Sequence, residues 1–130
     1  MSRTVLLIED NEQNRYLTTF LLARSGYAVA TAVDGPAGIA MARAETPDLI
    51  LLDIQLPGMD GYAVARALRQ IPALASTPII AVTSYAMVGD REKSLESGCD
   101  GYIEKPINPE TFVSEIERVA PPRPTGASAP

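Results

Sequence analysis

Short apolar runs alternate with longer segments of helical periodicity along almost the whole chain. The runs are rich in Val, Ile, Leu and Ala and are bounded by Gly, Pro or Asp, a pattern typical of strands. Between them, apolar residues recur three or four positions apart, which is typical of helices that bury one face. Strands are therefore predicted at Thr4–Ile8, Ala28–Thr31, Leu49–Leu52, Ile79–Val82 and Gly101–Ile103.

Five helices are predicted between and after these strands. The first is expected to bury Leu17, Phe20 and Leu21 and to end at a Ser-Gly pair. The fourth is the weakest, because Gly89 lies inside it and few of its residues are apolar. The last has the clearest pattern, with Asn108 as its N-cap. The predicted spans are Glu12–Arg24, Gly35–Ala44, Gly61–Gln70, Val88–Ser97 and Asn108–Val119.

This strict alternation predicts an α/β fold: a doubly wound, five-stranded parallel sheet, (βα)5, with helices on both faces. The strands are apolar almost throughout, as strands buried on both faces are. Residues 1–120 are expected to form this single domain. Residues 121–130 are rich in Pro and small residues and are predicted to be a disordered tail.

Composition and charge narrow the function classes. The 130 residues include one cysteine, so no internal disulfide can form and a reducing, cytoplasmic location is expected. No apolar stretch is long enough for a membrane helix, and the start of the chain does not resemble a signal peptide. The net charge of -5 disfavours direct nucleic-acid binding. The absence of histidine excludes a Ser/His or Cys/His nucleophile pair and a His-ligated metal.

Functional side chains follow four of the apolar runs. Glu9 and Asp10 come directly after the first predicted strand and Asp53 after the third. Thr83 follows the fourth, and Lys105 lies just beyond the fifth. Because the carboxyl ends of parallel strands lie at one edge of a sheet, these side chains are expected to meet there.

Three carboxylates at one edge imply either bound protons or a bound cation. Two such charges about 4 Å apart repel by roughly 4 kcal/mol at an effective dielectric near 20. Oxygen ligands without histidine or cysteine favour a hard ion, Mg²⁺ above all. A carboxylate such as Asp53 can also act as a nucleophile and form an aspartyl phosphate, with Lys105 binding a phosphate oxygen. Taken singly, each residue also has an ordinary interpretation: a helix-terminal acid for Glu9 and Asp10, a turn residue for Asp53, an N-cap for Thr83 and a loop cation for Lys105.

Four segments together carry a resemblance to a known family. They are Val5-Leu6-Leu7-Ile8-Glu9-Asp10-Asn11, Asp53 with Leu56-Pro57-Gly58-Met59-Asp60-Gly61, Val82-Thr83-Ser84 and Glu104-Lys105-Pro106. In this combination the chain resembles the receiver domains of response regulators, the CheY-like family, from Thr4 to about Val119. Within that family it is most similar to stand-alone, single-domain receivers of the DivK type.

The resemblance implies a reaction centre and a metal site. Asp53 would accept a phosphoryl group. Mg²⁺ would be held by Glu9, Asp10, Asp53 and the main-chain carbonyl of Gln55. Glu9 stands where the family often has Asp, a variation that the family tolerates.

The resemblance also implies the parts of a switch. Thr83 would be the hydroxyl that moves toward the phosphoryl group, and Lys105 would contact that group. A cis peptide bond is expected before Pro106, where it would aim the lysine. Tyr102 matches the switch aromatic of the family.

The function implied by the resemblance is that of a response regulator in a two-component system or phosphorelay. A histidine kinase or histidine phosphotransfer protein would donate the phosphoryl group, and the surface of the last helices would then bind a protein target in trans. The chain would not be an enzyme beyond catalysing its own phosphotransfer and slow autodephosphorylation. It is expected to be a monomer or weak dimer that binds neither nucleic acid nor membrane. The alternative is a phosphate sink or phosphorelay shuttle without its own output.

Two other classes share the predicted architecture. A flavodoxin-like electron carrier would need a phosphate-cradling loop after the first strand, where this chain has the acids Glu9 and Asp10. A phosphatase of the haloacid dehalogenase type would need a second Asp two residues after its nucleophile, where this chain has Gln55. Absence of a yellow chromophore and failure to turn over phosphate monoesters would exclude these two classes.

Overall fold

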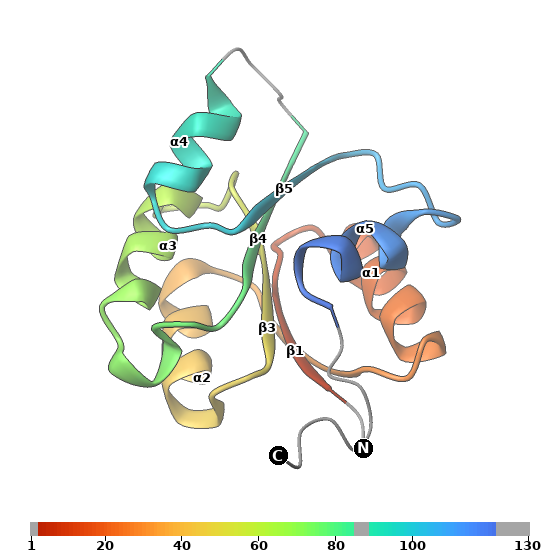
Figure 1. The fold of residues 1–130 in the computed structure, drawn as a ribbon, viewed down its shortest axis with the longest axis horizontal. Helices are drawn as coiled ribbons and strands as arrows, with labels where there is room; N and C mark the ends of the chain where they lie inside the picture. Colours follow the sequence, from red (N-terminus) through yellow and green to blue (C-terminus); the bar gives the residue numbers. More distant parts are fainter. Residues whose placement is uncertain (1–2, 85–88, 122–130) are drawn as a thin grey trace.

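The structure, a computed structural model, describes residues 3–84 and 89–121. They contain one five-stranded sheet with the strand order β2-β1-β3-β4-β5. All neighbouring strands are parallel. Helices cover both faces of the sheet (Figure 1), which confirms the predicted fold class. The strands are β1 (Thr4–Ile8), β2 (Ala28–Ala32), β3 (Leu49–Asp53), β4 (Ile79–Thr83) and β5 (Gly101–Glu104). The helices are α1 (Glu12–Arg24), α2 (Gly35–Glu45), α3 (Gly61–Arg69), α4 (Asp90–Glu96) and α5 (Phe112–Val119), with a 3₁₀ turn, η1, at Pro72–Leu74.

The sheet separates two apolar cores. In Figure 1, α1 and α5 lie on one face and α2, α3 and α4 on the other. Leu22 of α1 and Phe112 of α5 belong to the first core, and Ile8 of β1 and Leu68 of α3 to the second. Successive strand residues point to opposite faces, so a strand between the two cores must be apolar at every position. Residues Leu49–Leu52 of β3 are accordingly all fully buried.

Polar side chains cap the first three helices. Asn11, Asp34 and Asp60 each accept a hydrogen bond from the main-chain N–H three residues later. Such caps satisfy N–H groups that the first turn of a helix leaves unpaired. Asn11 lies three residues after the end of β1 and caps α1, which begins at the next residue. The loop that carries Glu9 and Asp10 is therefore short.

The prediction that Phe20 is buried is wrong. Its side chain is 51% exposed, whereas Thr18, Leu21 and Leu22 are buried against the sheet. Apolar residues occupy more than one side of α1, so their spacing alone does not show which side faces the core. The Arg24 guanidinium lies 5.5 Å from the centroid of the Phe20 ring and covers part of it.

The last helix begins later than predicted. α5 starts at Phe112, not at Asn108. The Asn108 side chain accepts from the N–H of Glu110, only two residues on, and its carbonyl accepts from the N–H groups of Thr111 and Phe112. Asn108 therefore closes a turn that precedes the helix, because a side-chain bond two residues on is the geometry of such a turn.

The fourth helix is shorter than predicted. α4 spans Asp90–Glu96, and Gly89 is its N-cap, with φ of 92°, not a residue inside it. Gly98, with φ of 109°, follows the C-cap and turns the chain toward β5. Val88 lies outside the described residues.

The ends of the elements bear on two further predictions. Four strands end one residue later than predicted, so Asp53 and Thr83 belong to the sheet itself. Of the predicted disordered tail, residues 122–130 lie outside the described part of the chain, and the domain boundary at residue 120 stays a prediction.

Within residues 3–84 and 89–121, no helix has the length and apolar character needed to cross a bilayer.

Candidate functional site

The candidate site lies at the carboxyl edge of the sheet. β1 and β3 are neighbours, so Glu9, directly after β1, lies beside Asp53, the last residue of β3. Asp10 follows Glu9, and one carboxylate oxygen from each of the three acids lies within 4.8 Å of the others. β4 ends at Thr83, and Lys105 directly follows β5. The parallel sheet thus gathers the predicted residues at one edge.

A lysine bridges two of the carboxylates. Lys105 Nζ lies 2.7 Å from Glu9 Oε1 and 3.3 Å from Asp53 Oδ2. The Lys105 side chain is 9% exposed and the other two are each 4% exposed. The Glu9 and Asp53 carboxylates are close together and shielded from water, so their negative charges would repel strongly. The Lys105 ammonium offsets that repulsion. The shorter contact shows that Glu9 holds the lysine more closely than Asp53 does.

Main-chain donors orient both buried carboxylates. The N–H of Gln55 donates to Asp53 Oδ1 at 2.9 Å, and the N–H of Asn11 donates to Glu9 Oε2 at 3.2 Å. In each carboxylate one oxygen is therefore held by the backbone, while the other contacts Lys105. The two side chains are oriented by contacts that need no ligand.

The environment makes Asp53 harder to ionise than an ordinary aspartate. Burial, together with the hydrogen bond and charge of Glu9, raises the pKa of Asp53 from 3.8 to about 6. Burial contributes most, because removal of water disfavours the charged form. The Gln55 N–H and the Lys105 ammonium act in the opposite direction. Above pH 6 the carboxylate is charged at a cost, which a further cation would reduce.

The acidic cluster fits a magnesium ion. Glu9 and Asp53 are buried, whereas Asp10 is exposed, so the cluster is open to solvent on one side. Carboxylate oxygens with an open side suit a hard ion that keeps part of its water shell. The Lys105 ammonium lies between two of the carboxylates, so this edge of the sheet already holds one positive charge.

The remaining predicted residues surround this cluster. Thr83 is buried at the end of β4, and the Gln55 side chain accepts from the first N–H after that strand at 3.4 Å. Tyr102 is half-buried and packs against the core on the α2–α3 face. The peptide bond between Lys105 and Pro106 is cis.

Sequence reasoning missed the role of Arg15 at the site and did not explain why Gly61 is a glycine. Arg15 of α1 donates through Nη1 to the main-chain carbonyls of Glu9 and Asp10, at 3.1 and 3.2 Å, and so ties the helix to the acidic loop. Gly61 begins α3 against the main chain of Ile54, where any Cβ would clash. Its place after the Asp60 cap is a sequence signal for a helix start, but only the tertiary contact explains the need for glycine.

Comparisons with known proteins bear on the family to which the chain belongs. The response regulator receiver domain model matches residues 5–117. The polar-differentiation response regulators DivK of Brucella ovis and Brucella abortus are each 41% identical over 117 residues, which is 90% of this chain and 95% of theirs. The chemotaxis response regulator CheY4 of Vibrio cholerae has a TM-score of 0.87 at 30% identity, over 92% of this chain and 99% of that one.

A second solved structure bears on the metal. The receiver domain of a sensor histidine kinase from Pseudomonas aeruginosa has a TM-score of 0.84 at 33% identity, over 92% of this chain and 99% of that one. It was solved with a magnesium ion coordinated in its active site cleft. Sequence, fold and the arrangement of the acidic edge therefore agree, and the chain belongs to the CheY-like family of response regulator receiver domains, the phosphoacceptor modules of two-component signalling.

Proposed function

We propose that the protein is a phosphorylation switch in which Asp53 accepts a phosphoryl group from the phosphohistidine of a histidine kinase or histidine phosphotransfer protein. The observation that carries this proposal is the buried Asp53 carboxylate at the edge of the sheet, which a main-chain donor orients and which shares the Lys105 ammonium with Glu9. Membership of the receiver family supports it.

Asp53 is the proposed nucleophile. One of its carboxylate oxygens forms a bond to phosphorus, while the bond from phosphorus to the partner's imidazole nitrogen breaks and its electron pair stays on that nitrogen. The Gln55 N–H already orients the carboxylate, so less freedom is lost when the partner docks. The chain contains no histidine, which suits an acceptor.

Mg²⁺ is the proposed cofactor, with Glu9, Asp10, Asp53 and the main-chain carbonyl of Gln55 as its ligands. When bound, the ion would offset the negative charge that accumulates on the carboxylates and the phosphoryl oxygens. The acidic cluster and the magnesium-bound receiver from Pseudomonas aeruginosa support this assignment.

Lys105 and Thr83 are proposed to bind the transferred group. A phosphoryl group on Asp53 carries close to two negative charges and strong acceptor oxygens. Lys105 Nζ is 3.3 Å from Asp53 Oδ2, so a small movement of the ammonium is enough to pair it with a phosphoryl oxygen. The Thr83 hydroxyl, at the end of the neighbouring strand, would donate a hydrogen bond to another.

The surface of the last helices is proposed to carry the signal. Movement of Thr83 toward the phosphoryl group would leave room for Tyr102 to turn inward from its half-buried position. α4 is the element most easily shifted, because it has seven residues and its buried Ser94 hydroxyl has no hydrogen-bond partner among the described residues. The face formed by α4, β5 and α5 would then bind a protein target in trans, in the cytoplasm.

The proposal is tested by intact mass after incubation with acetyl phosphate and Mg²⁺. We expect a gain of one phosphoryl group in the unaltered protein and none in Asp53→Asn. A chelator should abolish the gain, because it removes the ion that offsets the developing charge. Labelling retained in Asp53→Asn would refute the assignment of the acceptor.

A matched variant controls for loss of an acid in general. Asp60→Asn removes an exposed carboxylate that caps α3, and Asn caps helices as well as Asp does. This variant should be labelled like the unaltered protein.

A histidine kinase provides a second phosphoryl donor besides acetyl phosphate. After autophosphorylation of the purified kinase with radiolabelled ATP, we expect transfer of the label to the unaltered protein and none to Asp53→Asn.

A further inference from the structure

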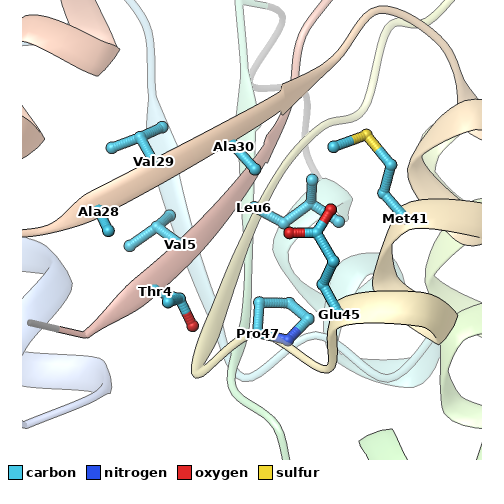
Figure 2. A pocket seen from close by; sticks show the side chains of 9 residues that line it. All are labelled: Thr4, Val5, Leu6, Ala28, Val29, Ala30, Met41, Glu45 and Pro47. Carbon is cyan, nitrogen blue, oxygen red and sulfur yellow. The ribbon is translucent and has the colours of Figure 1, made fainter.

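A pocket of about 200 Å³ lies at the opposite end of the strands from Asp53. It opens between the edge strand β2 and α2, and its walls include Leu6 of β1, Ala30 of β2 and Met41 of α2 (Figure 2). Pro47, just after α2, also lines it. Most of the lining residues are apolar, and none of them belongs to the site described above.

The pocket exists because β2 carries small side chains where it faces α2. Ala30 and Ala32 both belong to the core on that side, so Ala28 shares their face. Methyl groups are too short to fill the space between the strand and the helix. Met41, half-buried on the opposite wall, is flexible enough to adjust to an occupant.

One carboxylate stands at this apolar pocket. Glu45 is the last residue of α2, and Figure 2 shows its side chain extended toward Leu6. The C-terminal end of a helix carries partial negative charge, so an acid there is disfavoured unless a cation is near. Among the residues that the structure describes, no Lys or Arg nitrogen lies within 4 Å of its oxygens. The carboxylate thus offers an unmatched negative charge to a ligand.

We propose that this pocket is a second ligand site, independent of the proposed phosphoryl chemistry, and that it takes a small organic cation with a ring-sized apolar body. The size follows from the volume, because an apolar cavity of about 150 Å³ holds a benzene ring. The charge follows from Glu45. The hydroxyl of Thr4, also in the wall, is already bonded to Asp48 and is not available as a competing polar anchor.

The test is an NMR titration of the ¹⁵N-labelled protein with benzylamine, a cation at neutral pH, and with benzyl alcohol, its neutral counterpart. Benzylamine should shift the amides of Ala30, Met41 and Glu45 along a saturable curve. Benzyl alcohol should shift the same amides with a dissociation constant about fivefold higher. This difference in affinity is the one expected from a single exposed ion pair. Curves that do not saturate, or shifts confined to other residues, would overturn the site.

Variants separate the charge from the cavity. Glu45→Gln should remove the preference for benzylamine and leave benzyl alcohol unaffected, whereas Glu12→Gln, an exposed acid on α1, should change neither. Ala30→Leu, which fills the cavity, should weaken both ligands. A preference that survives Glu45→Gln would overturn the assignment of the ligand class. Asp53→Asn should leave both titrations unchanged. Failure of ligand binding at the pocket can therefore be distinguished from failure of phosphorylation at Asp53.

Discussion

Replacement of Asp53 by Asn should make the metal-free protein more stable at neutral pH, although it removes the proposed reactive group. The carboxylate is 3% exposed and lies beside the equally buried Glu9. Asn keeps the oxygen that accepts from the Gln55 N–H, and it loses the negative charge together with the 3.3 Å contact from Lys105 to Asp53 Oδ2. The contact between Lys105 and Glu9 at 2.7 Å is also retained.

The magnitude follows from the pKa. Burial and Glu9 raise the pKa of Asp53 from 3.8 to about 6, and each pH unit corresponds to about 1.4 kcal/mol. The folded state therefore holds the proton more tightly than the unfolded state does. Ionisation costs stability progressively from about pH 4 to 6, and the full cost, about 2–3 kcal/mol, is present above pH 6. Asn mimics the uncharged form and avoids this cost.

The assay is urea unfolding followed by circular dichroism, in a chelator, at a series of pH values. At pH 7.5 the Asn variant should be about 2–3 kcal/mol more stable, which for a domain of this size raises Tm by about 8–12 °C. The gap should close as the pH falls toward 4. Added Mg²⁺ should stabilise the unaltered protein more than the variant, because binding to the folded state adds stability and the variant lacks one proposed ligand.

Equal stability of the two proteins at pH 7.5, or a gap that does not depend on pH, would refute the reasoning that a buried charge at Asp53 is costly. Asp60→Asn is the control. Its carboxylate is exposed and its cap survives the change, so its stability should stay within about 0.5 kcal/mol of the unaltered protein.

Two further predictions concern Arg69 of α3 and Ser94 of α4. Arg69→Met should lower the free energy of unfolding by about 2–4 kcal/mol, because the guanidinium donates to three main-chain carbonyls at 2.7–2.8 Å and to Asp100 at 2.6 Å. Urea unfolding measures the loss, and a loss no larger than that of Asp100→Asn would contradict the importance of the carbonyl contacts. Ser94→Ala should raise stability by about 1 kcal/mol, because the buried hydroxyl has no partner among the described residues. Ser97→Ala, which removes a hydroxyl bonded to the α4 backbone at 2.8 Å, should give no such gain, and thermal unfolding of both variants tests the contrast.

Most residues of the candidate site could be located from the sequence, because their positions depend only on the direction of the strands that they follow. In a parallel sheet with helical crossovers, all strands run the same way, so residues after successive strands share one edge. Glu9, Asp53 and Lys105 each follow an apolar run and therefore had to come near one another. Their short contacts could not be predicted, since these depend on the side-chain conformations that packing selects.

Other features depend on contacts between segments far apart in the chain. Arg69 joins α3 to the loop before β5 through Asp100, 31 residues later, and nothing local marks the pair. The spacing of Phe20 predicts a place in the core, yet the packing of α1 on the sheet leaves it exposed to solvent. Helix periodicity identifies a helix but not the side that faces the sheet when apolar residues occupy more than one side.

The sequence itself determined the order of strands and helices, the class of the fold and which side chains meet at the carboxyl edge of the sheet. It could do so because alternation of apolar and polar positions and short capping signals act locally. The tertiary structure alone decided that Glu9 holds Lys105 more closely than Asp53 does, that Asp53 is costly to ionise, and that Glu45 stands at an apolar pocket. The physical reason is the same in each case. Burial, charge pairing and cavity volume are properties of surfaces brought together by folding, and a residue's neighbours along the chain do not set them.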